Sequence, residues 1–284
     1  MQGKHSRAGV EWRVVAVVVL CCSLLAYSVL ATVLLFRQPQ TATISSRTRP
    51  SYLLSSIEDL FDFITVTTVN CSNSQVIPGS SVLETEDRMI SGHEGTYICL
   101  DALPETPTQE SCRIYSFGIN RNDIKFETVM GQRGCRVHLL MANTEYSYSR
   151  LKPNVYLYPL ELTVSPSLNN YTLDGFLDLL THMWKPIHYV KTTTRGSEWT
   201  FLKTLYLSGY EAYTHVKQIR LLLHLPYATD DHFKDLESLY HLLLGLEYYG
   251  YRLVHSRPIP DSIYIIHNLQ RHVATKYETV WIRE

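Results

Sequence analysis

"CRIYSFGINRNDIKFETVMGQRGCRVHLLM", residues 112–141, alternates between two kinds of apolar pattern. The run from Cys112 to Ile119 is mostly apolar and leads into a glycine, which is typical of a buried strand. DIKFETVMGQRG then spaces its apolar residues as a helix does and ends at Gly131 or Gly134. CRVHLLM is a second apolar run. The segment therefore predicts a strand, a helix and a second strand parallel to the first.

The same alternation continues toward the C-terminus. Helices are predicted for Thr172–Met183, Glu198–Leu207 and Asp230–Tyr249. Strands are predicted for 155–162, 187–193, 216–225, 251–259, 262–269 and 277–284. Residues 216–225 (VKQIRLLLHL) are apolar almost throughout, as in a parallel strand that is covered on both faces. Strands that alternate with helices and end in several strands together indicate an α/β fold whose sheet is mostly parallel with an antiparallel end.

The N-terminal part has a different composition. Val14–Phe36 contains no charged residue and is long enough to cross a hydrocarbon core of about 30 Å as a helix. A cleaved signal peptide is the alternative, but its apolar region is usually shorter and ends at an A-x-A-like site. Residues 37–56 are rich in Ser, Thr and Arg. The sequence therefore predicts a cytoplasmic tail (1–13), a transmembrane signal anchor (14–36), a flexible stem (37–56) and a lumenal domain (57–284).

Equal numbers of Lys and Arg residues flank the two sides of this anchor, so they do not indicate its orientation. The orientation is therefore inferred from the sequons and cysteines of the large domain. Asn70 and Asn170 lie in N-x-S/T sequons, which are glycosylated only in the secretory pathway. An even number of cysteines lies outside the span, namely Cys71, Cys99, Cys112 and Cys135. Disulfides among these cysteines are expected in an oxidising lumen, and buried free thiols are the alternative. We therefore expect a single-pass type II protein of the Golgi or another secretory-pathway membrane.

Composition excludes some partners. The formal net charge is −1 and no long basic or acidic block occurs, so we expect no nucleic-acid partner. No C-x-x-C pair lies outside the predicted span, and TDDHF (229–233) is most simply a helix start, so no metal site is predicted.

The order of a membrane anchor, a stem and a lumenal domain also suggests a glycosyltransferase. The chain lacks the Asp-x-Asp pair that often holds the metal of such enzymes.

Several of these segments, in this order, resemble a membrane-anchored methyltransferase-like family. They are GTYICLDA (95–102), residues 112–140 with their YSFGI and GC.VH motifs, TLDGFLDLL (172–180), VKTTTRGSEWTFLKTL (190–205) and VKQIRLLLHL (216–225). The resemblance covers roughly Ile57–Glu284. It implies an S-adenosylmethionine-dependent methyltransferase domain behind a signal anchor. The implied fold is a Rossmann-like class I methyltransferase sheet of seven strands, mostly parallel with an antiparallel end.

The resemblance also implies where the cofactor binds. In such a fold the ligand lies outside the carboxyl ends of the first strands. The implied S-adenosylmethionine-binding positions are Phe117, Gly118, Ile119, Asn120, Asp123 and Met141. In relatives an aspartate at the position of Met141, within H-x-F-D-P, accepts hydrogen bonds from the ribose hydroxyls. A thioether is a weak acceptor, so we expect this contact to be lost here.

Three further acidic positions of the implied site are replaced. Relatives read LKIDIEGSEW where this chain has Thr193 for the aspartate and Arg195 for the glutamate. In the fifth strand Leu222 replaces the glutamate of an E-x-H motif, while His224 is kept. His224 is a candidate general base for an oxygen or nitrogen acceptor. The alternative is a histidine that is hydrogen-bonded at the sheet edge.

The sequence thus predicts a methyltransferase-like membrane protein whose methyl transfer is impaired or absent. Its acceptor would be a glycan, a protein or a small molecule. A non-catalytic binding or scaffold protein on the same fold is the alternative. A glycosyltransferase is a weaker alternative from another class.

Overall fold

The computed structural model describes residues 52–78, 84–85, 88–89, 95–118, 124–141, 147–167, 170–208, 211–266 and 271–284. All of them belong to one compact unit, Ile44–Glu284. The predicted tail, the predicted anchor and most of the predicted stem lie outside these residues. Within the part that is described, no helix has both the length and the apolar character needed to span a bilayer.

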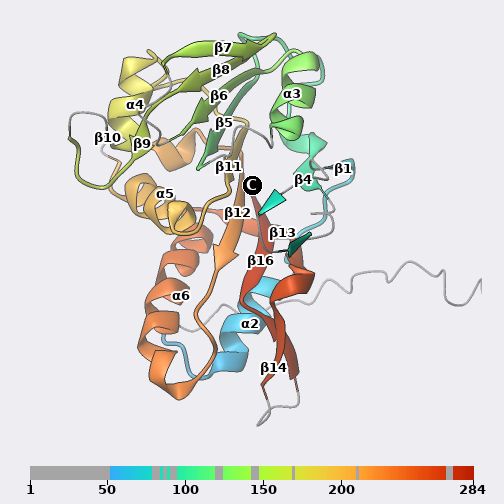
Figure 1. The fold of residues 1–284 in the computed structure, drawn as a ribbon, viewed down its shortest axis with the longest axis vertical. Helices are drawn as coiled ribbons and strands as arrows, with labels where there is room; N and C mark the ends of the chain where they lie inside the picture. Colours follow the sequence, from blue (N-terminus) through green and yellow to red (C-terminus); the bar gives the residue numbers. More distant parts are fainter. Residues whose placement is uncertain are drawn as a thin grey trace, which may run out of the picture. The chain divides into compact units, whose positions relative to one another are not determined.

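An eight-stranded sheet forms the centre of this unit (Figure 1). Its order is β13 (Tyr251–Pro258), β16 (Lys276–Arg283), β12 (Gln218–His224), β11 (Tyr189–Thr192), β5 (Arg113–Phe117), β6 (Arg136–Leu140), β8 (Val155–Tyr158) and β7 (Ser149–Lys152). The five strands from β12 to β8 are parallel, and β16 is antiparallel to both of its neighbours. The structure is thus a mixed α/β fold with a mostly parallel sheet, consistent with a Rossmann-like fold.

Three predictions about strands need correction. The sheet has one strand more than the seven expected, because β7 pairs antiparallel with β8 through a turn at Asn154, where φ is 64°. The predicted strand 262–269 is present as β14 (Ile263–Ile266), but it pairs with β15 (Arg271–Ala274) in a separate hairpin. The predicted strand 155–162 is divided at Pro159, which cannot donate a ladder hydrogen bond, and resumes as β9 (Glu161–Leu162).

Short strands complete the described structure. β9 pairs with β10 (Asn170–Tyr171) and β1 (Ser74–Ile77) pairs with β4 (Thr96–Cys99). β2 (Glu84–Thr85) pairs with β3 (Arg88–Met89).

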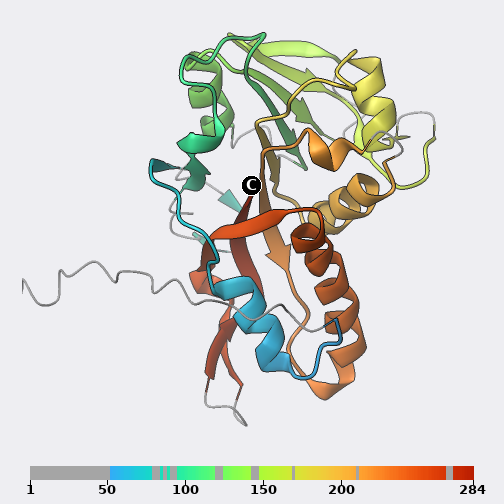
Figure 2. The same cartoon turned by 180° about the vertical axis from the view of Figure 1, so that it is seen from behind.

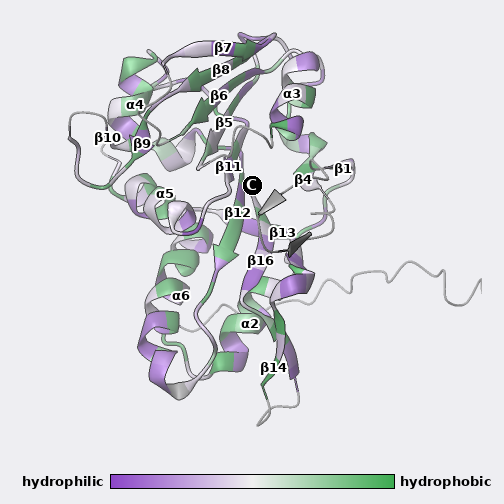
Figure 3. Cartoon of the chain, in the orientation of Figure 1, coloured by the Kyte–Doolittle hydropathy of each residue, from purple (hydrophilic) through white to green (hydrophobic). Residues whose placement is uncertain are grey.

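Helices cover both faces of the sheet (Figures 1 and 2). The first apolar layer contains residues of α2 (Ile57–Thr65), α4 (Leu173–Leu179), α5 (Ser197–Tyr206) and α6 (Phe233–Tyr248). The second contains residues of α3 (Lys125–Gln132), β1 and β4. Figure 3 shows much of β12 as hydrophobic, and six of its seven residues are buried. The prediction of a strand covered on both faces is therefore confirmed.

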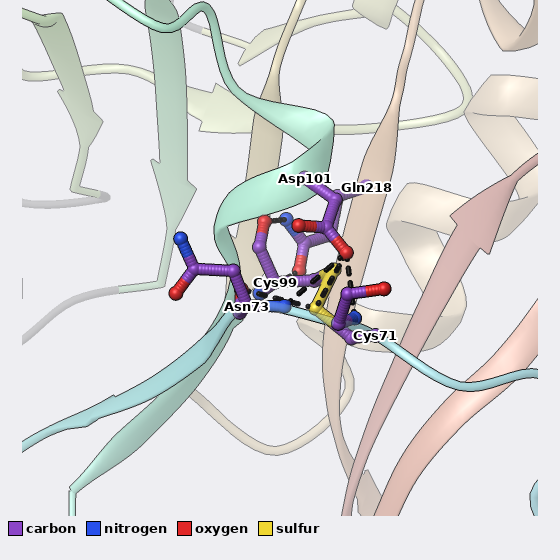
Figure 4. Close-up of a disulfide and its surroundings, with 6 residues drawn as sticks. Cys71, Asn73, Cys99, Asp101 and Gln218 are labelled. Carbon is purple, nitrogen blue, oxygen red and sulfur yellow. Dashed lines mark hydrogen bonds between the residues drawn. A yellow bond between two sulfur atoms is a disulfide. The ribbon is translucent and has the colours of Figure 1, made fainter.

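The four cysteines of the domain form two disulfides, Cys71–Cys99 and Cys112–Cys135. The second joins the residues that precede β5 and β6, two adjacent parallel strands. The first fixes the end of β4 to the segment before β1, where Asp101 accepts hydrogen bonds from the backbone N–H groups of Ser72 (2.7 Å) and Asn73 (3.3 Å) (Figure 4).

A buried glutamine attaches β4 to the main sheet (Figure 4). Gln218 is fully buried, and its Oε1 accepts from the N–H of Cys99 at 2.8 Å. Its Nε2 donates to the carbonyl of the same residue at 3.1 Å. The side-chain amide therefore satisfies both backbone groups of a residue that has no access to water.

A group of buried histidines lies near the strands β5 and β6. His138 stacks on Tyr115 with ring centroids 4.9 Å apart, and Tyr115 Oη lies 2.6 Å from His182 Nδ1. Burial, reinforced by the neighbouring His182 and Arg136, lowers the pKa of His138 well below its ordinary value. Burial and the charge of Arg113 also lower the pKa of His182 and of His188, each to about 4.

We predict that Gln218→Leu lowers the free energy of unfolding by about 2–4 kcal/mol. The substitution leaves two buried backbone groups of Cys99 without partners, and each such loss costs about 1–3 kcal/mol. Chemical denaturation measures the change. The exposed Gln132 provides the control, because Gln132→Leu removes an amide that water can replace. A loss no larger for Gln218→Leu than for the control would contradict the role of this amide.

We also predict that the folded state loses stability as the pH falls from about 6.5 toward 4. In the unfolded chain His138, His182 and His188 bind protons below a pKa of about 6.5, whereas in the folded chain burial lowers their pKa values and they stay neutral to lower pH. Each unit of lowering is worth about 1.4 kcal/mol. Thermal unfolding between pH 7.5 and 4.5 measures the dependence. His182→Asn should reduce the slope, while His272→Asn, at an exposed position, should not. A stability that is constant or rises over this interval would disprove the prediction.

Candidate functional site

A pocket of about 260 Å³ lies at the carboxyl ends of β5, β6 and β11. Phe117 and Gly118 line it at the end of β5, and Leu140 lines it at the end of β6. The remaining lining residues are 160–162 at β9, 194–197 after β11, and Thr200 in α5. The chain proceeds from β5 toward β6 and β8 on one side and later returns to β11 on the other. Such a reversal of strand order is where open α/β sheets bind ligands.

Gly118 allows the loops after β5 and β11 to approach each other. Its φ is +67°, a left-handed conformation that favours glycine. A Cβ atom at this position would overlap Oγ1 of Thr194. The N–H of Gly118 donates to the carbonyl of Leu140 at 3.2 Å, which ties the end of β5 to the end of β6.

The other wall of the pocket is the start of α5. Gly196, with φ +90°, is the N-cap residue and has no side chain to cap the helix. Ser197 Oγ donates to the carbonyl of Thr194 at 2.6 Å, which closes the turn between β11 and the helix. Four successive lining residues, 194–197, therefore come from one tight turn, which connects the predicted strand 187–193 to the predicted helix Glu198–Leu207.

Two charged side chains line this pocket, Glu161 from β9 and Arg195 from the turn. Both residues are exposed. The other lining side chains are apolar or carry hydroxyl groups. Glu161 was not predicted as a site residue, because it follows Pro159 in what the sequence indicated was a continuous strand. The pocket thus contains one carboxylate, which comes from a segment the sequence did not implicate.

A buried ion pair supports the pocket from the opposite face of the sheet. Lys191 Nζ and Ser116 Oγ each lie 2.9 Å from Oε1 of Glu127. Lys191 and Glu127 are 3% and 0% exposed, so neither charge is solvated by bulk water. The other oxygen, Oε2, is buried and has no hydrogen-bond partner in the described part of the chain. These contacts join α3, β5 and β11, the three elements at the base of the site.

A second buried acid contacts the predicted candidate base. Oε1 of Glu198 accepts from the backbone N–H of His224 at 3.0 Å and lies 3.1 Å from its Nδ1. The Glu198 side chain is fully buried, whereas that of His224 is 15% exposed. His224 ends β12, and it does not line the pocket. Ser197 and Thr200, on either side of Glu198 in the sequence, do line the pocket. The first turn of α5 therefore contacts both the pocket and His224.

The other predicted positions are distributed as follows. Phe117 and Gly118 line the pocket, whereas Ile119, Asn120 and Asp123 lie outside the described residues. Met141 is 9% exposed and packs in the second apolar layer, and Leu140 lines the pocket instead. Leu222 is buried in β12. Of the two sequon residues, Asn70 is exposed, and Asn170 is half-buried in β10.

Comparison with known proteins gives one distant similarity. The chain is 24% identical over 181 residues to a human protein named "Probable methyltransferase-like protein 24". The aligned part covers 58% of this chain and 48% of that protein, so the match spans about half the length of the relative. No family profile matches the chain, and no solved structure matches it significantly. The similarity supports a methyltransferase-like family.

We predict that Gly118→Ala lowers the free energy of unfolding by about 1–3 kcal/mol, because it adds a left-handed strain and an overlap with Thr194. Adding Thr194→Gly should recover part of the loss, since it removes the overlapping atom. A double-mutant cycle by chemical denaturation measures this coupling. Gly175→Ala is the control, because Gly175 lies in α4 with room for a methyl group. An equal cost at both glycines would contradict the proposed close approach.

Proposed function

We propose that this protein is methyltransferase-like and that its pocket receives an S-adenosyl nucleoside. The observation that carries the proposal is the pocket's place at the reversal of strand order. The arrangement of the last strands supports it. In chain order, the sixth of the seven expected strands is β13 at the edge, and the seventh, β16, lies antiparallel between β13 and β12. The antiparallel end of this mostly parallel sheet agrees with what the sequence resemblance implies.

The residues present fit the uncharged parts of such a ligand. Phe117, Leu140 and Leu162 offer apolar surface for an adenine ring. The carboxylate of Glu161 can accept hydrogen bonds from ribose hydroxyls, the role that Met141 cannot fill. Gly118 lets backbone approach the ligand closely. S-adenosylmethionine, when bound, supplies an electrophilic methyl group on a sulfonium.

The charged part of the ligand fits less well, and we therefore propose that methyl transfer is impaired. Relatives have carboxylates where this chain has Met141, Thr193, Arg195 and Leu222. Arg195 lines the pocket, so one of these changes places a cation where an anion is expected. The same observation favours the second candidate, a non-catalytic binding or scaffold protein on this fold.

If transfer occurs, His224 is the candidate base for an oxygen or nitrogen acceptor. When Nδ1–H donates to the Glu198 carboxylate, the neutral imidazole keeps its lone pair on Nε2. That atom can accept a proton from the attacking group. The acceptor would be a glycan, a protein or a small molecule.

We further propose a single-pass type II membrane protein with this domain in the lumen of the Golgi or another secretory compartment. Two disulfides support an oxidising environment. Asn70 is exposed beside the first of them, where a glycan can be accommodated.

Calorimetric titration of the purified full-length chain tests the proposed ligand. We expect saturable binding of S-adenosylhomocysteine by the wild-type protein and its loss in Gly118→Asp, because a side chain at this lining position would overlap Thr194 and displace the pocket wall. Gln132→Leu, outside the pocket, should bind normally. No heat at high ligand concentration would remove the proposal.

Radiolabelled S-adenosylmethionine tests the proposed impairment separately. We expect at most slow label transfer to protein or glycan acceptors. Rapid transfer that disappears in Gly118→Asp would show a fully active enzyme instead.

A further inference from the structure

The charges that line the pocket are balanced. Arg195 is an exposed cation, and in the described part of the chain it has no ion-pair partner. Glu161 is an exposed anion on a different segment. The first turn of α5 adds a partial positive charge from its backbone, and the buried Glu198 of the same turn offsets it. The pocket therefore presents no net negative charge to a ligand.

This balance has different consequences for two closely related ligands. S-adenosylmethionine and S-adenosylhomocysteine share the adenosine and amino-acid groups, so contacts to those groups cancel when their affinities are compared. They differ by one methyl group and one positive charge on sulfur. The ratio of their dissociation constants therefore reports chiefly the electrostatic potential at the sulfur atom.

We infer that Arg195 shifts the ligand preference of this pocket toward the neutral thioether nucleoside, because it offsets the carboxylate of Glu161 that would attract the sulfonium methyl donor. The inference rests on the proposed function and names the form of ligand that the site holds. Two unit charges about 8 Å apart, at an effective dielectric constant of about 20, change an equilibrium by a factor of about 30. Because Arg195 is exposed and salt screens over about 8 Å, we expect an effect of about three- to tenfold.

The lining provides variants that should act in opposite directions. Arg195→Gln removes the cation, Arg195→Glu restores the charge that relatives carry, and Glu161→Gln removes the anion. Both positions are exposed, so these side chains are replaced without loss of buried contacts. Arg150→Gln is the matched control, because Arg150 is an exposed arginine on β7, which does not line the pocket.

The experiment is calorimetry of the full-length chain with each of the two ligands at an ionic strength of about 0.15 M, where the screening length is about 8 Å. We expect the wild-type protein to bind the thioether more tightly than the sulfonium. The ratio of the dissociation constants (sulfonium over thioether) should fall about three- to tenfold in Arg195→Gln and further in Arg195→Glu. It should rise in Glu161→Gln and stay unchanged in Arg150→Gln.

The outcomes separate this inference from the proposed function. Binding of both ligands with a ratio that neither Arg195 variant changes would overturn the inference and leave the proposed function intact. Binding of neither ligand by the wild-type protein would overturn both. Thermal unfolding of each variant verifies that it is folded, so that a lost affinity is not mistaken for a lost fold.

Discussion

The ion pair between Lys191 and Glu127 is the interaction on which the site depends. It joins α3 to β11 in a region without access to water, and Ser116 brings β5 into the same contact. A buried charge is tolerated only when it is paired, so removal of either partner would leave the other at a cost of about 3–5 kcal/mol. The pocket lies at the carboxyl ends of β5 and β11, the two strands that these contacts join to α3. Its geometry therefore depends on a contact beneath it as well as on the lining residues Gly118 and Ser197.

Much of the fold could be predicted because its signals are local. The apolar run of β5, the helical spacing of α3 and the continuous apolar residues of β12 each lie within one stretch of sequence, and all three elements are present. The partner of β14 could not be predicted, because its apolar residues would fit the main sheet equally well. The strand β7 was missed because Ser149–Lys152 is a polar edge strand whose only signal is the turn at Pro153 and Asn154.

The site was predicted less completely, and for a similar reason. Phe117 and Gly118 were identified because they end a recognisable strand. Three features of the structure bring together segments that are distant in sequence. Glu161 lines the pocket beside the loops after β5 and β11. Glu198 contacts His224, and Gln218 binds the backbone of Cys99. No local pattern marks such pairs. Met141 was implied as a cofactor-binding residue by its position in the sequence, but its side chain packs in the second apolar layer. The described structure thus has left-handed glycines and a buried ion pair at a pocket whose lining carries one cation and one anion.

A crystal structure of the protein grown with S-adenosylhomocysteine would test most directly whether this pocket is the ligand site. We expect ligand density in the pocket lined by Phe117, Leu140 and Leu162, with the ribose hydroxyls within hydrogen-bond distance of the Glu161 carboxylate. Ligand density at another place, or an unchanged pocket at saturating ligand, would contradict the proposed site.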